Sequence, residues 1–142
     1  MEKARHVLKK FPSCWVIGAD TVVVLDGKIF GKPADEAEAS RMLSSLRGGS
    51  HWVLTGVALV GRKGRFAKTR VEKTRVSFKA FPTRELGRYL KSREPFDKAG
   101  GYDIQGTARS WIKGWKGDYF NVMGLPVEWL AGQLNRHVFG DD

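Results

Sequence analysis

The chain has 142 residues, 42% of them apolar and 28% charged, with a formal net charge of +10 at pH 7. A chain of this length and apolar content is expected to fold as one domain around its own core, which excludes a disordered tail. No apolar run is long enough to cross a bilayer. Residues 1–15 contain no apolar signal core and no small-residue cleavage site, so we expect a cytoplasmic protein with no membrane partner.

The basic excess, 25 Lys and Arg against 15 Asp and Glu, favours anionic partners such as nucleic acid, nucleotides or anionic lipid. A soluble basic surface explains it equally well, because the basic residues are spread along the chain. Cys14 is the only cysteine, which excludes an intrachain disulfide, and its apolar flanks predict a packed, unreactive thiol. The histidines show no metal-ligand spacing, which argues against a zinc site.

The first third of the chain predicts a helix, a long strand and a hairpin. Apolar residues spaced i, i+3, i+4 and i+7 over residues 4–11 predict a helix that ends at Pro12. Residues 15–25, rich in Val and Ile, predict a strand. The Asp-Gly pair that follows predicts a tight turn into a second strand at residues 28–30.

The middle of the chain predicts a helix and two longer strands. Asp35 is a suitable N-cap for a helix that the two glycines after Arg47 would end. Residues 52–60 and 66–81 predict strands. The apolar alternation of the second changes parity between Val71 and Val76, which predicts a bulge or break there.

The last third predicts a helix from Pro82, a glycine-rich loop over 93–108, a short strand at 110–115 and a final helix after Pro126. Helices and short-turned strands therefore alternate without an internal repeat or linker. This pattern predicts a single α/β domain over residues 1–142, with a mixed twisted sheet flanked by helices.

Asp20 stands in the middle of the predicted strand 15–25, where a buried charge is costly unless something compensates it. Gly18 precedes it, and a strand glycine often marks close approach of a ligand or another backbone. Such a carboxylate could bind Mg²⁺, orient a water or act as a base. An aspartate that faces solvent, or one paired with a core arginine, explains the pattern equally well.

Two loops add residues that suit phosphate chemistry. Lys32, in a Gly-Lys-Pro loop, is placed to meet a phosphate, although a solvated loop lysine is the commoner interpretation. Residues 94–106 combine three glycines, whose N–H groups can approach an anion, with Asp97 and Lys98, which could hold metal and phosphate. Gln105 could read a base edge through its amide. A structural loop whose glycines serve turns is the alternative.

Five segments occur in the order and at the spacing of the Maf family of nucleoside triphosphate pyrophosphatases, which the chain resembles over almost its whole length. They are VIGADTVV (16–23), GKP (31–33), SLRGGSHWVLTGVAL (45–59), DKAGGYDIQG (97–106) and GDYFNVMGLP (117–126). The resemblance implies the α/β fold of the inosine-triphosphate pyrophosphatases, with a cleft between two lobes. It also implies cleavage of a pyrimidine or modified nucleoside triphosphate to its monophosphate and pyrophosphate, with Mg²⁺ or another divalent cation.

Carried over position by position, the resemblance implies one catalytic residue and a set of substrate-binding residues. Asp20 matches the family's aspartate, proposed to activate water or hold the metal. The substrate-binding positions that it implies are Lys3, Thr21, Lys32, Asp97, Lys98 and Gln105. The chain departs from the pattern at Asp103, where the family usually has Gly.

The family's Ser-x-Ser-Pro-Arg-Arg segment, a strand and loop that grips the phosphates, has no counterpart in the sequence. We therefore expect an exposed sheet edge covered by a second copy, in a homodimer or other homo-oligomer. Three hypotheses follow. The presence of Asp20, Lys32 and Gln105 favours an active pyrophosphatase. The missing segment favours a catalytically impaired nucleotide-binding or oligomeric scaffold. The net charge of +10 favours a basic nucleic-acid-binding protein.

Overall fold

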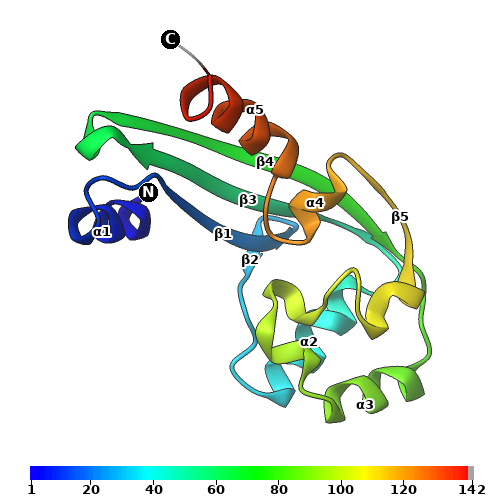
Figure 1. The fold of residues 1–142 in the computed structure, drawn as a ribbon. Helices are drawn as coiled ribbons and strands as arrows, with labels where there is room; N and C mark the ends of the chain where they lie inside the picture. Colours follow the sequence, from blue (N-terminus) through cyan, green and yellow to red (C-terminus); the bar gives the residue numbers. More distant parts are fainter. Residues whose placement is uncertain (141–142) are drawn as a thin grey trace.

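The computed structural model describes residues 1–140, and five strands form its sheet in the order β2-β1-β3-β4-β5 (Figure 1). The strands are β1 (Val16–Leu25), β2 (Lys28–Phe30), β3 (Ser50–Gly61), β4 (Phe66–Phe78) and β5 (Ile112–Lys116). The helices are α1 (Glu2–Lys10), α2 (Glu36–Leu46), α3 (Thr83–Lys91), α4 (Tyr119–Val122) and α5 (Val127–His137). Short 3₁₀ turns fill much of the segment between α3 and β5.

The register gives the sheet two different faces. One face, here called the core face, carries alternate residues of β3 that are all buried: His51, Val53, Thr55, Val57 and Leu59. The other, here called the open face, carries Trp52 and Gly56 of β3 and Val71 of β4, all exposed. β-Branched residues at the alternate positions make such a half-buried strand stable.

Two apolar clusters hold the domain together. The larger one packs α2, α3 and the segment before β5 against core-face residues such as Val23, Val53 and Val76. The smaller one packs α1 against Ala58 and Val60, at one end of the open face. α1 lies close to β1: a Cβ built on Gly18 would lie only 3.1 Å from the Cβ of Ala4.

One edge of the sheet is only partly paired. β2 pairs with β1 at residues 23–25 alone, and within residues 1–140 the outer edge of β1 from Val16 to Val22 has no neighbouring strand. No helix in the described part of the chain is long and apolar enough to cross a membrane.

The predicted α/β class with a helix-flanked sheet is confirmed. The sheet was predicted to be mixed, but every strand pairing in the described chain is antiparallel. The hairpin after β1 is confirmed, as is the cap of α2, where Asp35 accepts a hydrogen bond from the N–H of Glu38 at 2.7 Å. The stripe Leu86, Tyr89 and Leu90 of α3 is buried as predicted.

Two further predictions are wrong. The register between β3 and β4 runs without a break from Phe66 to Ser77, so no bulge separates Val71 from Val76. Val71 is instead an exposed residue on the open face, whereas Val76 belongs to the core face; the irregularity lies between Ser77 and Phe78, opposite β5. Cys14 is exposed, because it lies in the turn after α1, where apolar neighbours do not cover it.

Candidate active-site cleft

A cleft of about 190 Å³ lies at the outer end of the core face, beside β1. Five segments contribute to it: β1, the loop after β2, Val53 of β3, residues 97–102 and residues 122–124. The cleft brings together most of the residues that the sequence singled out: Asp20, Thr21, Lys32, Asp97 and Lys98. Two acidic and two basic residues therefore line one small space.

The two cation-bearing loops of the cleft are joined through their backbones. The N–H of Gly100 donates to the carbonyl of Gly31 at 3.0 Å, which fixes the loop of Lys98 against the loop of Lys32. Gly100 has φ +72°, and a Cβ built on it would lie 2.9 Å from Cγ2 of Val23. Only glycine combines that conformation with so close an approach to β1.

Two aromatic hydroxyl groups clamp the same loop from the core side. Tyr89 donates to the carbonyl of Gly101 at 2.7 Å, and Oη of Tyr102 lies 2.6 Å from Nε2 of His51. Burial lowers the pKa of His51 to about 4, so its imidazole is neutral at pH 7. Burial also raises the pKa of Tyr102, which keeps its hydroxyl protonated.

Asp20 is exposed, which agrees with the solvent-facing position that the sequence left open beside a compensated buried charge. It points to the open face, where Gly56 is its partner in the register. A Cβ built on Gly56 would meet nothing within 4 Å, so there is free space beside the carboxylate. Within residues 1–140 this carboxylate forms no ion pair, which leaves it available to a ligand.

Asp20 also borders a second, larger hollow of about 610 Å³ on the open face. Lys3 of α1 lines this hollow together with Arg70, on the other side of Asp20 from Lys32. The structure therefore places Lys3 near the predicted catalytic residue, although it is not among the residues that line the smaller cleft. Asp20 therefore lies at the junction of two spaces, each lined by at least one lysine.

Gln105 lines neither space. It is exposed, and its N–H donates to Oδ1 of Asp103 at 2.9 Å. Asp103 in turn lies 3.9 Å from Nζ of Lys98, a weak, partly exposed ion pair. The substrate-binding role of Gln105 stays a prediction.

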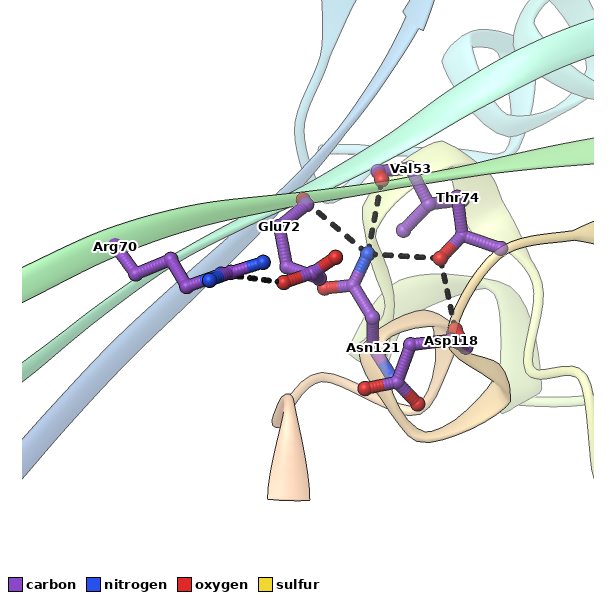
Figure 2. Close-up of polar contacts among 6 residues, drawn as sticks. All are labelled: Val53, Arg70, Glu72, Thr74, Asp118 and Asn121. Carbon is purple, nitrogen blue, oxygen red and sulfur yellow. Dashed lines mark hydrogen bonds and ion pairs between the residues drawn. The ribbon is translucent and has the colours of Figure 1, made fainter. Parts of the chain in front are cut away.

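A hydrogen-bond network centred on Asn121 of α4 lies behind the cleft and was not predicted from the sequence (Figure 2). Asn121 is fully buried, and its Nδ2 lies within hydrogen-bond distance of the carbonyls of Val53 and Glu72 and of Oγ1 of Thr74, at 3.1 to 3.2 Å. These bonds fasten α4 across β3 and β4. Residues 122–124, which line the cleft, follow directly.

A second part of the network reaches the cleft itself. Thr55 donates to the carbonyl of Asn121 at 3.2 Å, and its Oγ1 lies 2.8 Å from Oγ1 of Thr21. Asp118 begins α4 by accepting from the N–H groups of the next turn. The sequence signal for these residues was the segment GDYFNVMGLP, which supported the resemblance but gave no role to Asn121.

Within residues 1–140 no group of three or more His, Cys, Asp or Glu side chains is arranged to hold a metal ion. The carboxylates of the cleft are those of Asp20 and Asp97. Mg²⁺ in nucleotide sites is commonly held by one or two carboxylates and the substrate's phosphates. The donor set therefore suits a metal that arrives with a triphosphate.

A family model described as "Maf-like protein" matches residues 1–137. The chain belongs to this family. Three curated relatives called dTTP/UTP pyrophosphatase are similar to the chain over nearly all of its length. They come from Koribacter versatilis (48% identical, covering 95% of this chain and 69% of the relative), Halalkalibacterium halodurans (48%, 97% and 72%) and Symbiobacterium thermophilum (49%, 96% and 69%). The match of this Maf-like chain includes the cleft, since all its lining residues lie within 1–137.

Proposed function

We propose that the chain is a nucleoside triphosphate pyrophosphatase that cleaves pyrimidine nucleotides to their monophosphates and pyrophosphate. The observation that carries the proposal is the position of Asp20, an exposed carboxylate between two spaces lined by Lys32 and Lys98 on one side and Lys3 on the other. The similarity to relatives called dTTP/UTP pyrophosphatase supports both the reaction and the pyrimidine preference.

In the proposed reaction, a water molecule attacks the α-phosphorus, an O–P bond forms, and the bond to the departing pyrophosphate breaks. Asp20 accepts the proton that the water loses, as a general base. Lys32 and Lys98, held together by the bond between their loops, stabilise the negative charge that grows on the phosphate oxygens. Lys3 is placed to bind a phosphate on the far side of Asp20.

We also propose a divalent cation, with Mg²⁺ as the first choice. Asp20 and Asp97 would hold it together with the substrate's phosphates. When bound, such an ion neutralises phosphate charge and helps to orient the phosphates.

The test is the release of pyrophosphate from dTTP and UTP, compared with dATP, by the wild type and by Asp20→Asn. We expect the variant to lose about 10²- to 10⁴-fold in rate, because a positioned base is removed. The matched control is Asp26→Asn, which makes the same change at an exposed aspartate of the β1–β2 turn. We expect chelation with EDTA to stop the reaction and added Mg²⁺ to restore it.

Two outcomes would contradict this proposal. Equal rates for the wild type and Asp20→Asn would remove Asp20 from the chemistry. A lack of pyrophosphate release from any nucleotide by the folded wild type would favour the nucleotide-binding scaffold instead. Undiminished release in EDTA would reject the divalent cation alone.

We further propose a homodimer. The outer edge of β1 from Val16 to Val22 is unpaired within the described residues and includes the exposed Ile17, and such an edge can pair with another chain. Light scattering at micromolar concentration is expected to give twice the chain mass of 15.9 kDa. A monomer mass would contradict the dimer without affecting the proposed reaction. The cytoplasmic location stays a prediction from the sequence.

A further inference from the structure

We propose that the open face of the sheet binds single-stranded nucleic acid through a surface made of Trp52, Lys73, Arg75, Lys113 and Lys116, here called the basic face. This surface is separate from the cleft. In the register Trp52 pairs with Val24 of β1. Val24 lies four residues, or about 13 Å, along the strand from Asp20, so Trp52 lies at a similar distance from the cleft residue.

The basic face is a continuous row across three strands. The register places Trp52 of β3 opposite Arg75 of β4, and Arg75 opposite Lys116 of β5. The guanidinium carbon of Arg75 lies 6.0 Å from the ring centroid of Trp52. Lys73 follows two residues away on the same face of β4, about 7 Å along the strand.

Within residues 1–140 the charges of this surface have no counter-charge. Lys73, Arg75, Lys113 and Lys116 are all exposed, and none of them forms an ion pair within residues 1–140. Arg75 and Lys116 lie directly opposite each other on neighbouring strands, an arrangement of like charges that destabilises a sheet. A bound polyanion would relieve this repulsion.

A hollow of about 390 Å³ adjoins the row and has the same character. Its charged lining residues are Arg75, Lys113 and Lys116, and within residues 1–140 no acidic residue lines it. Three glycines also line it and leave part of its backbone accessible. The hollow therefore offers an anion site made of basic side chains and backbone groups.

The exposed indole ring of Trp52 distinguishes nucleic acid from other anions. Trp52 is 44% exposed on this face, and an indole ring contributes nothing to the binding of a lone phosphate. Single-stranded nucleic acid needs both components, cations that follow the backbone and aromatic rings on which unpaired bases stack. Duplex bases are already stacked on each other, so a duplex is expected to bind more weakly.

The experiment measures the fluorescence anisotropy of a labelled single-stranded dT12 oligonucleotide with the full chain, in a series of NaCl concentrations. The slope of log K against log[salt] is expected to be about −2 to −3, from three or four phosphates neutralised at about −0.7 each. Trp52→Ala is expected to weaken binding by about 5- to 150-fold, the range for loss of one stacked base, and Trp52→Phe to retain most of the affinity.

Charge variants separate the basic face from general charge. Arg75→Glu combined with Lys116→Glu is expected to weaken binding at least tenfold. The control pair, Arg84→Glu with Lys91→Glu, makes the same charge change at exposed positions of α3 and is expected to bind almost normally. Pyrophosphate release should be unchanged in all these variants, so failure here is distinguishable from failure of the proposed function.

Several results would overturn the proposal. They are no binding by the wild type, equal losses in the two charge pairs, or equal affinity for a 12-base-pair duplex. If free dTMP competes with the oligonucleotide when both are present at the same concentration of nucleotide units, the surface is a mononucleotide site instead. A light-scattering mass that doubles in the wild type but not in Trp52→Ala, with no oligonucleotide bound, would assign the face to a second copy of the chain.

Discussion

Two neighbouring residues of β1, Thr21 and Asp20, lie in opposite surroundings. Thr21 points to the core face, where its hydroxyl is hydrogen-bonded to Thr55 and through it to the backbone of Asn121. Asp20 points to the open face, opposite a glycine, and is exposed. Because side chains alternate along a strand, two consecutive residues have different roles here. Thr21 holds the site together, and Asp20 is free to react.

The same difference extends over the whole site. Most polar groups on the core side are buried and hydrogen-bonded: Nδ2 of Asn121 bonds to Thr74, and Tyr102 bonds to His51. Oδ1 of Asn121 and Nδ1 of His51 have no partner within residues 1–140. Charged groups that would meet a substrate, such as Lys32 and Asp97, are exposed. A largely hydrogen-bonded layer behind exposed charges positions catalytic groups without neutralising them.

The largest expected effect comes from a substitution in the buried hydrogen-bond network on the core side. Asn121→Ala removes one amide that serves the backbone of Val53 and Glu72 and the hydroxyl of Thr74. We expect a loss of about 3–4 kcal/mol in the free energy of unfolding, since buried groups lose their partners and a cavity forms. Urea unfolding measures it.

The control for that substitution is Asn135→Ala, which makes the same change at an exposed position of α5. It is expected to alter stability by no more than about 0.5 kcal/mol. Similar losses in the two variants would show that the network of Asn121 contributes nothing particular to the fold.

The second prediction makes one substitution on each side. Gly100→Ala is expected to cost about 2–4 kcal/mol, because it adds a Cβ at φ +72° and 2.9 Å from Val23. Gly56→Ala, beside Asp20 on the open face, meets nothing within 4 Å and is expected to be neutral or to stabilise the chain by about 0.5–1 kcal/mol.

Thermal unfolding of both glycine variants measures the difference in stability, and pyrophosphate release measures its consequence. We expect Gly100→Ala to lose activity with the position of the Lys98 loop. Gly56→Ala should remain folded and lose activity only to the extent that its methyl group crowds the ligand of Asp20. Equal stability of the two variants would reject the close contact between Gly100 and Val23.

The sequence was sufficient for features set by local chemistry. The Asp-Gly turn after β1, the Asp35 cap and the apolar stripe of α3 were all predicted, because each depends on residues close together in the chain. The exposure of Val71 was not predicted, and for Asp20 a solvent-facing position was only one of the explanations left open. Exposure depends on which face of the sheet α1 and the other helices cover, and alternation within a strand does not contain that information.

The candidate site was predictable to a similar extent. The residue types of Asp20, Lys32 and Lys98 suggested phosphate chemistry, but their meeting depends on the bond between Gly100 and Gly31, which are 69 residues apart in the sequence. Asn121 was missed for a related reason. A single asparagine in a turn gives no sign that its amide lies under two strands from a distant part of the chain.

The smallest expected effect appears only when the pH is lowered. Burial lowers the pKa of His51 to about 4 from its ordinary 6.5, so the folded chain keeps the imidazole neutral while the unfolded chain takes up a proton. The contribution of His51 is therefore fully present above pH 6.5 and is lost as the pH falls toward 4. The expected loss is about 2 kcal/mol at pH 5 and about 3 kcal/mol at pH 4.

Urea unfolding of the wild type and of His51→Gln, at pH 8, 6 and 5, isolates this contribution from that of other titrating groups. The variant keeps a polar side chain near Tyr102 but has no imidazole to protonate, so its stability should depend less on pH between 8 and 5 by about 2 kcal/mol. His6→Gln, at an exposed position of α1, should leave the wild-type dependence unchanged. If His51→Gln and the wild type lose the same free energy on acidification, His51 is not the buried neutral group that holds Tyr102 behind the cleft.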